Sequence, residues 1–157
     1  MIDNSKEYIL SAAIWYKDDT EAPRGFIAQN IDSGVVIGQW RHGNVINVRA
    51  TNPLWNAKKL AERRGENPMK IEKYEDTLSY FDEIDGFITS KGRFVDRWQA
   101  AELALLCGQI DKKRALNDEW EGDEEYMKDF QNQTPHWRGG EERNKCKYCM
   151  IYSEDLY

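Results

Sequence analysis

Three basic side chains lie close together in the sequence, in a pattern that favours binding of an anion such as phosphate. Lys91, Arg93 and Arg97 lie in a segment that has the pattern of a hairpin turn followed by the start of a helix. Asp96 stands at the expected N-cap, with Gln99 three residues later as in a capping box. Backbone N–H groups and the positive end of a helix dipole favour anions. The segment therefore predicts a small anion-binding site.

A second basic pair follows a run of β-branched residues. Arg41 and His42 come directly after Val35–Trp40. Two interpretations are open: a loop corner with Arg41 in water, or a second phosphate contact, because a guanidinium binds two phosphate oxygens at once. His42 could also act as a general base, but no partner for it is identifiable, and no pair of carboxylates stands out.

The motifs of common catalytic and metal sites are absent or incomplete. The chain has no G-x-S-x-G, Walker A or G-x-G-x-x-G pattern. Cys146 and Cys149 form a C-x-x-C pair, whereas a structural zinc site needs four ligands. The other candidates, His42, His136 and Cys107, are not at the usual spacing. We therefore expect no metal site and no catalytic residue of these classes.

Composition narrows the classes of partner. The chain has 157 residues, which fits one domain of ordinary size, and its 22 basic and 28 acidic residues give a net charge of −6. Proteins that coat DNA or RNA are usually basic, because phosphate neutralisation supplies most of their affinity. The longest apolar run near the start, Tyr8–Tyr16, is far shorter than a membrane span. Three cysteines, an odd number, argue against a disulfide scaffold and suit a reducing cytoplasm.

Short apolar runs predict the strands that would position these side chains. Tyr8–Tyr16 is expected to open a sheet, and Val35–Val48 is either one bent strand or a strand and the start of another element. Phe87–Thr89 and Arg93–Val95 flank a turn that contains glycine, which predicts a β-hairpin. The polar segment Lys17–Gly25 is expected to be a loop.

Apolar residues at helical spacing predict helices between and after the strands. Asn52 and Pro53 have the residue types of a helix start, and Gly65 would end that helix. Asp76–Ile84 predicts a short amphipathic segment. The helix after the hairpin, which Gly108 would end, is apolar around much of its circumference. We expect it to be buried, with a contact to another subunit as one means of burial.

The last third of the chain differs in composition. Residues from about 111 to 145 include the acidic run Asp118–Asp129, which predicts an exposed, partly helical insertion. We place it within a single domain that spans residues 1–157. Apolar residues return at Met150–Tyr157, which predicts a strand or tail held against the domain.

Four blocks of this sequence resemble the phage-encoded Thoeris anti-defence 1 family. They are Tyr8–Lys17, Asn30–His42, Gly86–Ile110 and Ile151–Tyr157, and the last block ends in Tyr-Ser-Glu-Asp-Leu-Tyr. Proteins of that family bind cyclic ADP-ribose isomers made by Thoeris TIR-domain enzymes and hold them without cleaving them, so that the downstream effector is not activated. Some members also bind cyclic oligonucleotides of the CBASS type at a separate site.

The resemblance implies an α+β fold, an antiparallel sheet with packed helices, assembled as dimers that can form hexamers. It implies a protein that is not an enzyme, has no catalytic residues, uses no cofactor and acts in the cytoplasm of the infected bacterial host. Its partners would be a cyclic ADP-ribose isomer or cyclic nucleotide and further copies of itself, with no DNA, RNA or membrane. Ligand pockets would lie at subunit contacts.

The resemblance also implies a set of ligand-binding residues. Phe87 matches an aromatic position suited to stacking on adenine, and the Arg-His block, the hairpin-helix block and a basic residue before the last block supply the polar contacts. The set is Arg41, His42, Phe87, Arg93, Arg97 and Arg143, with Lys145 and Lys147 as alternatives to Arg143. The sequence departs from the family pattern by extra residues between Arg49 and Gly86 and by the acidic stretch from Asp111.

Two other functions remain open. A hydrolase of the same signal would use His42 and an unidentified carboxylate. An acidic protein-interaction inhibitor would use the run Asp118–Asp129 to mimic nucleic acid and block a host protein.

Overall fold

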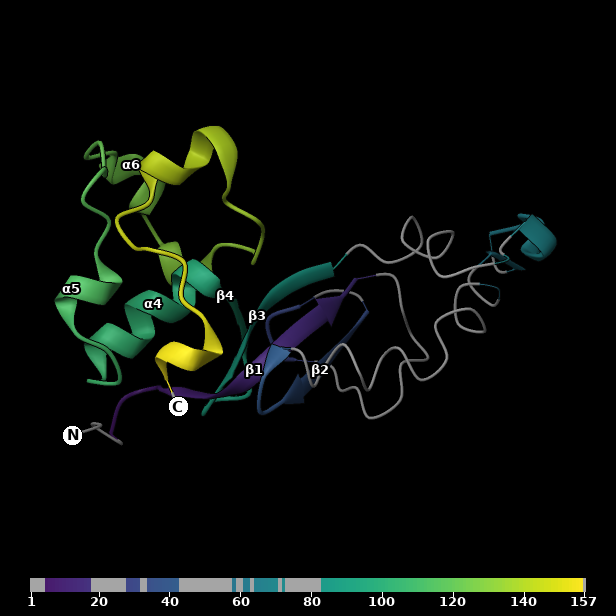
Figure 1. The fold of residues 1–157 in the computed structure, drawn as a ribbon, viewed down its shortest axis with the longest axis horizontal. Helices are drawn as coiled ribbons and strands as arrows, with labels where there is room; N and C mark the ends of the chain where they lie inside the picture. Colours follow the sequence, from purple (N-terminus) through teal and green to yellow (C-terminus); the bar gives the residue numbers. More distant parts are fainter. Residues whose placement is uncertain are drawn as a thin grey trace.

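The structure is a computed structural model that describes residues 5–17, 28–31, 34–42, 58, 61–62, 64–70, 72 and 83–156. The fold is α+β: four antiparallel strands form one sheet, and helices gather at one side of it (Figure 1). The strand order is β2-β1-β3-β4. In the described part of the chain, β1 and β3 therefore lie inside the sheet, and β2 and β4 form its edges.

The strands lie close to the positions that the sequence predicts. They are β1 (Ile9–Tyr16), β2 (Val35–Gln39), β3 (Glu83–Thr89) and β4 (Phe94–Asp96). The strand at Tyr8–Tyr16 and the hairpin are confirmed. β1 is buried along most of its length, which explains why its residues are nearly all apolar and do not alternate with polar ones. β3 begins earlier than expected, so Ile84 belongs to a strand and not to an amphipathic segment.

Alternate residues of the sheet pack into two apolar layers. Ala12 and Phe87 are register partners on one face, where they join the main core together with Val95. Trp15 and Phe94 lie on the other face, with ring centroids 6.1 Å apart in an edge contact. The main core lies on the side that the helices cover.

The helix α4 (Arg97–Leu106) begins and ends where the sequence places its caps. Asp96 accepts hydrogen bonds from the N–H groups of Trp98 (3.0 Å) and Gln99 (2.9 Å). The Gln99 side chain accepts one in return from the Asp96 N–H (3.0 Å). Gly108 follows the last turn with φ 85°, a left-handed conformation that glycine adopts readily. Other segments of the same chain bury most of the helix, but Leu106 near its end is 57% exposed. The contact to another subunit stays a prediction.

The rest of the C-terminal half consists of short helical turns on the same side of the sheet as α4 (Figure 1). They are α5 (Lys112–Ala115), α6 (Glu124–Met127), η3 (Phe130–Asn132), η4 (Gly140–Lys145) and η5 (Ser153–Asp155). Another 3₁₀ turn, η1 (Pro68–Lys70), precedes β3.

The acidic segment is not an exposed excursion throughout. Most of its acidic side chains face solvent, as expected, but Phe130 and Arg138 from residues 111–145 are buried. The Phe130 ring stacks on Tyr148 with ring centroids 5.9 Å apart. The segment therefore contributes to the core. Its status as an insertion relative to related proteins stays a prediction.

The C-terminal residues form a tail held against the domain. Ile151 is buried, and its N–H donates to the carbonyl oxygen of Arg97 (3.4 Å). The described part of this tail contains η5 and no strand. The predictions for residues 18–25, 43–48 and 76–82, and for most of the helix from Asn52 to Gly65, lie outside the described residues.

Candidate ligand-binding site

The N-terminus of α4 already holds an anion from its own chain. One carboxylate oxygen of Asp96 accepts the two helical N–H groups. The other accepts the N–H of His136 (3.2 Å) and forms an ion pair with Arg138. The dipole and the guanidinium of Arg138 are thus both matched within the chain, and the anion site predicted for Lys91, Arg93 and Arg97 stays a prediction.

Arg93 is also held by a contact within the chain. Its guanidinium donates two hydrogen bonds of 2.8 Å to the two carboxylate oxygens of Glu7, and another of 3.0 Å to the carbonyl oxygen of Gln131. Both charged side chains are mostly buried. Arg93 thus joins Glu7, two residues before β1, to the hairpin and to η3. These contacts give Arg93 a role in holding the fold.

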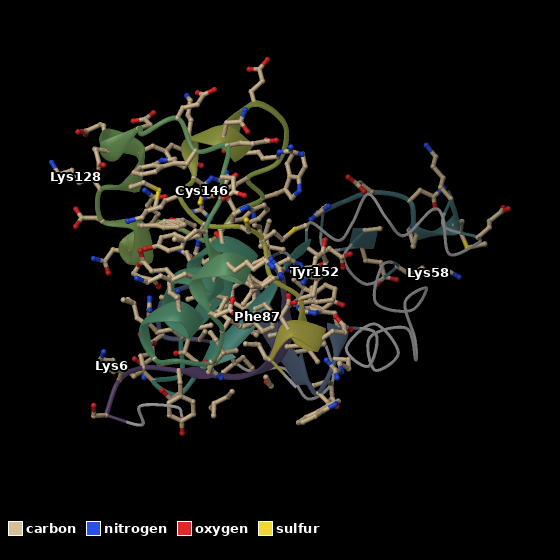
Figure 2. The ribbon with its side chains drawn as sticks, turned by 60° about the vertical axis from the view of Figure 1, so that its left-hand side comes forward. Lys6, Lys58, Phe87, Lys128, Cys146 and Tyr152 are labelled. Carbon is tan, nitrogen blue, oxygen red and sulfur yellow. The ribbon has the colours of Figure 1, made fainter. Side chains whose placement is uncertain are left out.

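Phe87 and His42 meet inside the protein. The Phe87 side chain is 0% exposed, and the His42 imidazole packs against it edge-on with centroids 5.0 Å apart. Figure 2 shows Phe87 in the middle of the packed elements. Nε2 of His42 lies 2.7 Å from the carbonyl oxygen of Gly86. Burial, and then the charge of Arg97, lowers the pKa of His42. A ring without an exposed face cannot stack on adenine, so Phe87 is a core residue here.

Arg41 and Arg97 each lie over an aromatic ring. The guanidinium carbon of Arg41 is 5.8 Å from the ring centre of Trp40, and that of Arg97 is 4.8 Å from the ring centre of Tyr152. Arg97 is mostly buried, and its Nη1 donates to the carbonyl oxygen of Ile151 (2.9 Å). Arg97 therefore fixes the C-terminal tail, while part of its side chain lines a small cleft.

Two clefts in the structure share a wall. The smaller has a volume of about 290 Å³ and is lined by the first residues of β3 and by Arg97. The larger has a volume of about 660 Å³ and is lined in part by α5 and by Arg143. Three side chains line both clefts: Trp98, Trp137 and Met150. The larger cleft falls within the range of sites that bind small molecules, about 300–1,000 Å³.

Backbone pairing joins two of the segments that line the larger cleft. Leu116 and Tyr148 form an antiparallel bridge, and beside it the Cys149 N–H donates to the carbonyl oxygen of Ala115 (2.8 Å). Leu116, Tyr148 and Cys149 all line the cleft. The bridge joins the end of α5 to the C-terminal tail, so two segments far apart in the sequence form one surface.

Charged side chains of both signs surround the larger cleft. Arg143 pairs with Glu119 at 3.2 Å, and both side chains are mostly exposed, so a ligand phosphate can replace Glu119 readily. Lys113 forms no salt bridge with any residue that the structure describes. Arg114, in contrast, is held by two hydrogen bonds to Asp155, of 2.9 and 2.7 Å. Two cations thus remain available for phosphate, and the carboxylates beside them can accept hydrogen bonds from hydroxyl groups.

Trp137 is the exposed aromatic ring where the two clefts adjoin. Its side chain is 67% exposed, although the next residue, Arg138, is fully buried in the ion pair with Asp96. The indole lies over Gly139, where any side chain would overlap its six-membered ring. Sequence reasoning missed Trp137 because it took Phe87 as the stacking ring. The available signal was the sequence Trp-Arg-Gly-Gly within an otherwise polar segment.

Comparison with known proteins places the chain among phage proteins. Residues 8–157 match the family described as Phage T4 y16D protein. The chain belongs to the phage T4 y16D protein family. No curated protein and no solved structure matches it. Across the residues that the structure describes, none of the helices has the length and apolar character needed to cross a bilayer.

The cysteines of this phage protein are not in a reactive setting. Cys107, Cys146 and Cys149 are all free thiols. Burial raises the pKa of Cys146 to about 11 and also raises the pKa of Cys149. The protonated thiol is a weak nucleophile and a poor metal ligand. Within the described ranges, no group of three or more His, Cys, Asp or Glu side chains is placed to hold a metal ion.

The two clefts offer binding groups and lack an imidazole base. No histidine lines either of them. His42 is packed against Phe87, and Nε2 of His136 lies 3.4 Å from the carboxylate of Glu142, both of these side chains being exposed. The lining of the clefts therefore suits stacking, phosphate pairing and hydrogen bonding to hydroxyl groups.

Proposed function

We propose that this phage protein binds a small phosphorylated nucleotide signal of the cyclic ADP-ribose type and sequesters it without cleaving it. In this role it is an anti-defence protein that withholds the Thoeris signal in the cytoplasm of the infected host, and, by the same chemistry, a cyclic oligonucleotide signal of CBASS defence. The observation that carries the proposal is the larger cleft, which brings the exposed indole of Trp137 together with Lys113 and Arg143. The family match bears on phage origin and not on the ligand.

The chemistry of such a signal suits the groups in the cleft. A cyclic ADP-ribose isomer has an adenine, two riboses and a pyrophosphate. Adenine calls for a flat ring, the pyrophosphate for a few cations, and the ribose hydroxyls for acceptors such as carboxylates. Two available cations suit two phosphates, whereas the net charge of −6 disfavours a long polyanion.

Sequestration depends on slow release of the signal. Differences in affinity come mostly from the dissociation rate, which falls as more of the ligand is buried. Trp137 lines one side of the cleft and is largely exposed to solvent. A second copy of the chain over this side would bury more of the ligand, so a homo-oligomer is part of the proposal.

Native mass spectrometry with cyclic ADP-ribose isomers and cyclic dinucleotides tests this function. We expect an adduct with the mass of one intact ligand at each site, and full recovery of the unaltered ligand after denaturation and chromatography. A product of changed mass would show that the protein is a hydrolase of the signal and does not sequester it intact. The absence of an adduct with every member of this panel would refute signal binding.

One observation favours a second candidate, an inhibitor that acts through its acidic surface. The side chains of Glu121, Glu124 and Glu125 all face solvent. Deleting their segment would disturb the fold, because Tyr126 and Met127 pack against the core. Replacing the three glutamates with glutamine keeps the shape and removes the charge. If this variant still captures the ligand but no longer inhibits host defence, mimicry is the main activity. If it does both, sequestration is the main activity.

A further inference from the structure

We infer that Trp137 is the platform on which the planar base of the ligand stacks, and that Gly139 is the residue that positions it. The inference rests on the proposed function and assigns its stacking group. It commits the cleft to a ligand that carries both a nucleobase and a phosphate.

The placement of Trp137 supports a stacking role. Its side chain is 67% exposed, which leaves a large apolar ring in water, and it lines both clefts. A base lying on this indole would therefore sit at the junction of the clefts. Lys113 and Arg143 line the larger cleft, so phosphates attached to the base have cations there. In the smaller cleft, Arg97 is already paired with Asp85 at 3.4 Å.

Gly139 makes room for the indole and is not required by the backbone. Its φ of −82° and ψ of −176° are extended values that any residue adopts. A Cβ at this position would overlap Cζ2, Cε2 and Cη2 of Trp137. The indole therefore lies over the Cα of Gly139, with the backbone behind it. A methyl group at this position would push the ring away while leaving the buried parts of the loop in place.

The loop that carries Trp137 is anchored on its buried side. Arg138 pairs with Asp96, donates from Nη2 to Oε1 of Gln133 (3.0 Å), and lies with its guanidinium carbon 4.8 Å from the ring centre of Phe130. These contacts fix the backbone between Trp137 and Gly139. An aromatic ring that is already in position loses less conformational freedom when a ligand binds.

Stacking gives the cleft an affinity for bases without selecting one of them, because every base has a π-face. The base identity would then depend on polar groups at its edge. The ligand class is therefore a nucleobase joined to phosphate, as distinct from a sugar phosphate without a base.

The test is a double-substitution cycle, measured by calorimetry with the same panel of cyclic ADP-ribose isomers and cyclic dinucleotides. We expect Trp137→Ala to weaken binding about 5- to 100-fold, while Trp137→Phe keeps most of the affinity. Gly139→Ala should weaken binding to a similar degree, but add nothing to Trp137→Ala, because it acts through the same ring. Trp40→Ala, which removes an indole that is 60% exposed and lines neither cleft, should leave binding unchanged.

Thermal unfolding and indole fluorescence complete the test. All variants should unfold close to the temperature of the unaltered protein, and the quenching of indole fluorescence by the ligand should be reduced in Trp137→Phe. If the unaltered protein binds a panel member and Trp137→Ala binds it equally well, the stacking assignment is overturned and the proposed function stands. A further loss on adding Gly139→Ala to Trp137→Ala would overturn the positioning role. If no panel member binds the unaltered protein, both the proposed function and this inference are refuted.

Discussion

Arg138 and Asp96 form an ion pair in which neither side chain is exposed to solvent. Asp96 also caps α4 and accepts the N–H of His136, so one carboxylate joins the hairpin, the helix and the loop that carries Trp137. Burial lowers the pKa of Arg138 to about 10, which leaves the guanidinium charged at neutral pH. The pair therefore connects the stability of the fold to the geometry of the candidate site.

The first prediction concerns this pair. Arg138→Met should destabilise the protein by about 3–5 kcal/mol, because it leaves the Asp96 carboxylate buried without its counter-charge. Denaturant unfolding measures the change. Arg143→Met is the matched control, since its pair with Glu119 is mostly exposed and should contribute less than about 1 kcal/mol. A similar loss of unfolding free energy in both variants would show that the Arg138 pair contributes no more to stability than an exposed pair.

The second prediction separates Arg93 from ligand binding. Arg93→Glu should destabilise the protein strongly, because it faces Glu7 with a second carboxylate in a partly buried place. The double variant Arg93→Met with Glu7→Met should recover much of this loss, since it removes both charges together. In that folded double variant, calorimetry should find unaltered ligand affinity. A loss of ligand affinity in this double variant would show that Arg93 contributes to ligand binding.

The third prediction is the pH dependence of the same contact. Burial alone would raise the pKa of the Glu7 carboxyl, but hydrogen bonds from Arg93 and Thr89 and the charge of Arg93 outweigh it, so the pKa lies below the ordinary value of 4.5. The stabilisation is therefore complete above pH 4.5 and is lost as the pH falls through the lower, folded value. The difference in unfolding free energy between the unaltered protein and Glu7→Gln should shrink in acid. A difference that stays constant down to about pH 2 would contradict this account.

Local elements were predictable because their signals lie in neighbouring residues. Asp96, Gln99 and Gly108 mark the two ends of α4, and the structure uses each as the sequence indicates. The apolar run of β1 and the glycine-containing turn of the hairpin are equally local signals. The buried parts of the acidic segment were not predicted, because isolated residues such as Phe130 are hard to recognise within a charged stretch.

The site was not predictable in the same way, because it depends on contacts between distant residues. A sequence shows that Arg93 is basic but not that Glu7, 86 residues away, already holds it. The same holds for Arg138 and Asp96, which lie 42 residues apart. Residue type likewise left open which aromatic ring is exposed: Phe87 lies in the core, and Trp137 faces solvent. Matching each charge to its partner requires the fold.

The fourth prediction concerns His42. Burial, and then the charge of Arg97, lowers its pKa below the ordinary value of 6.5. The unfolded chain therefore takes up the proton first, so this residue's contribution to stability is complete above pH 6.5 and is lost as the pH falls towards the folded pKa. Between about pH 7.5 and pH 5, the unaltered protein should lose stability more steeply than His42→Gln. Equal slopes for the two proteins would show that His42 does not titrate differently on folding.

The fifth prediction tests where the ligand's phosphates bind. Arg143→Glu and Lys113→Glu should each weaken binding of the captured signal about tenfold or more, because each replaces an available cation at the larger cleft with a negative charge. Lys128→Glu is the control: it changes the net charge by the same amount, but Lys128 is exposed, lines neither cleft and lies well away from Tyr152 and Phe87 in Figure 2. Calorimetry at about 150 mM salt keeps the comparison local, since charges farther apart than about 8 Å are then largely screened. If Lys128→Glu weakens binding as much as Arg143→Glu, the attraction belongs to the net charge of the protein, and the larger cleft is not where the phosphates lie.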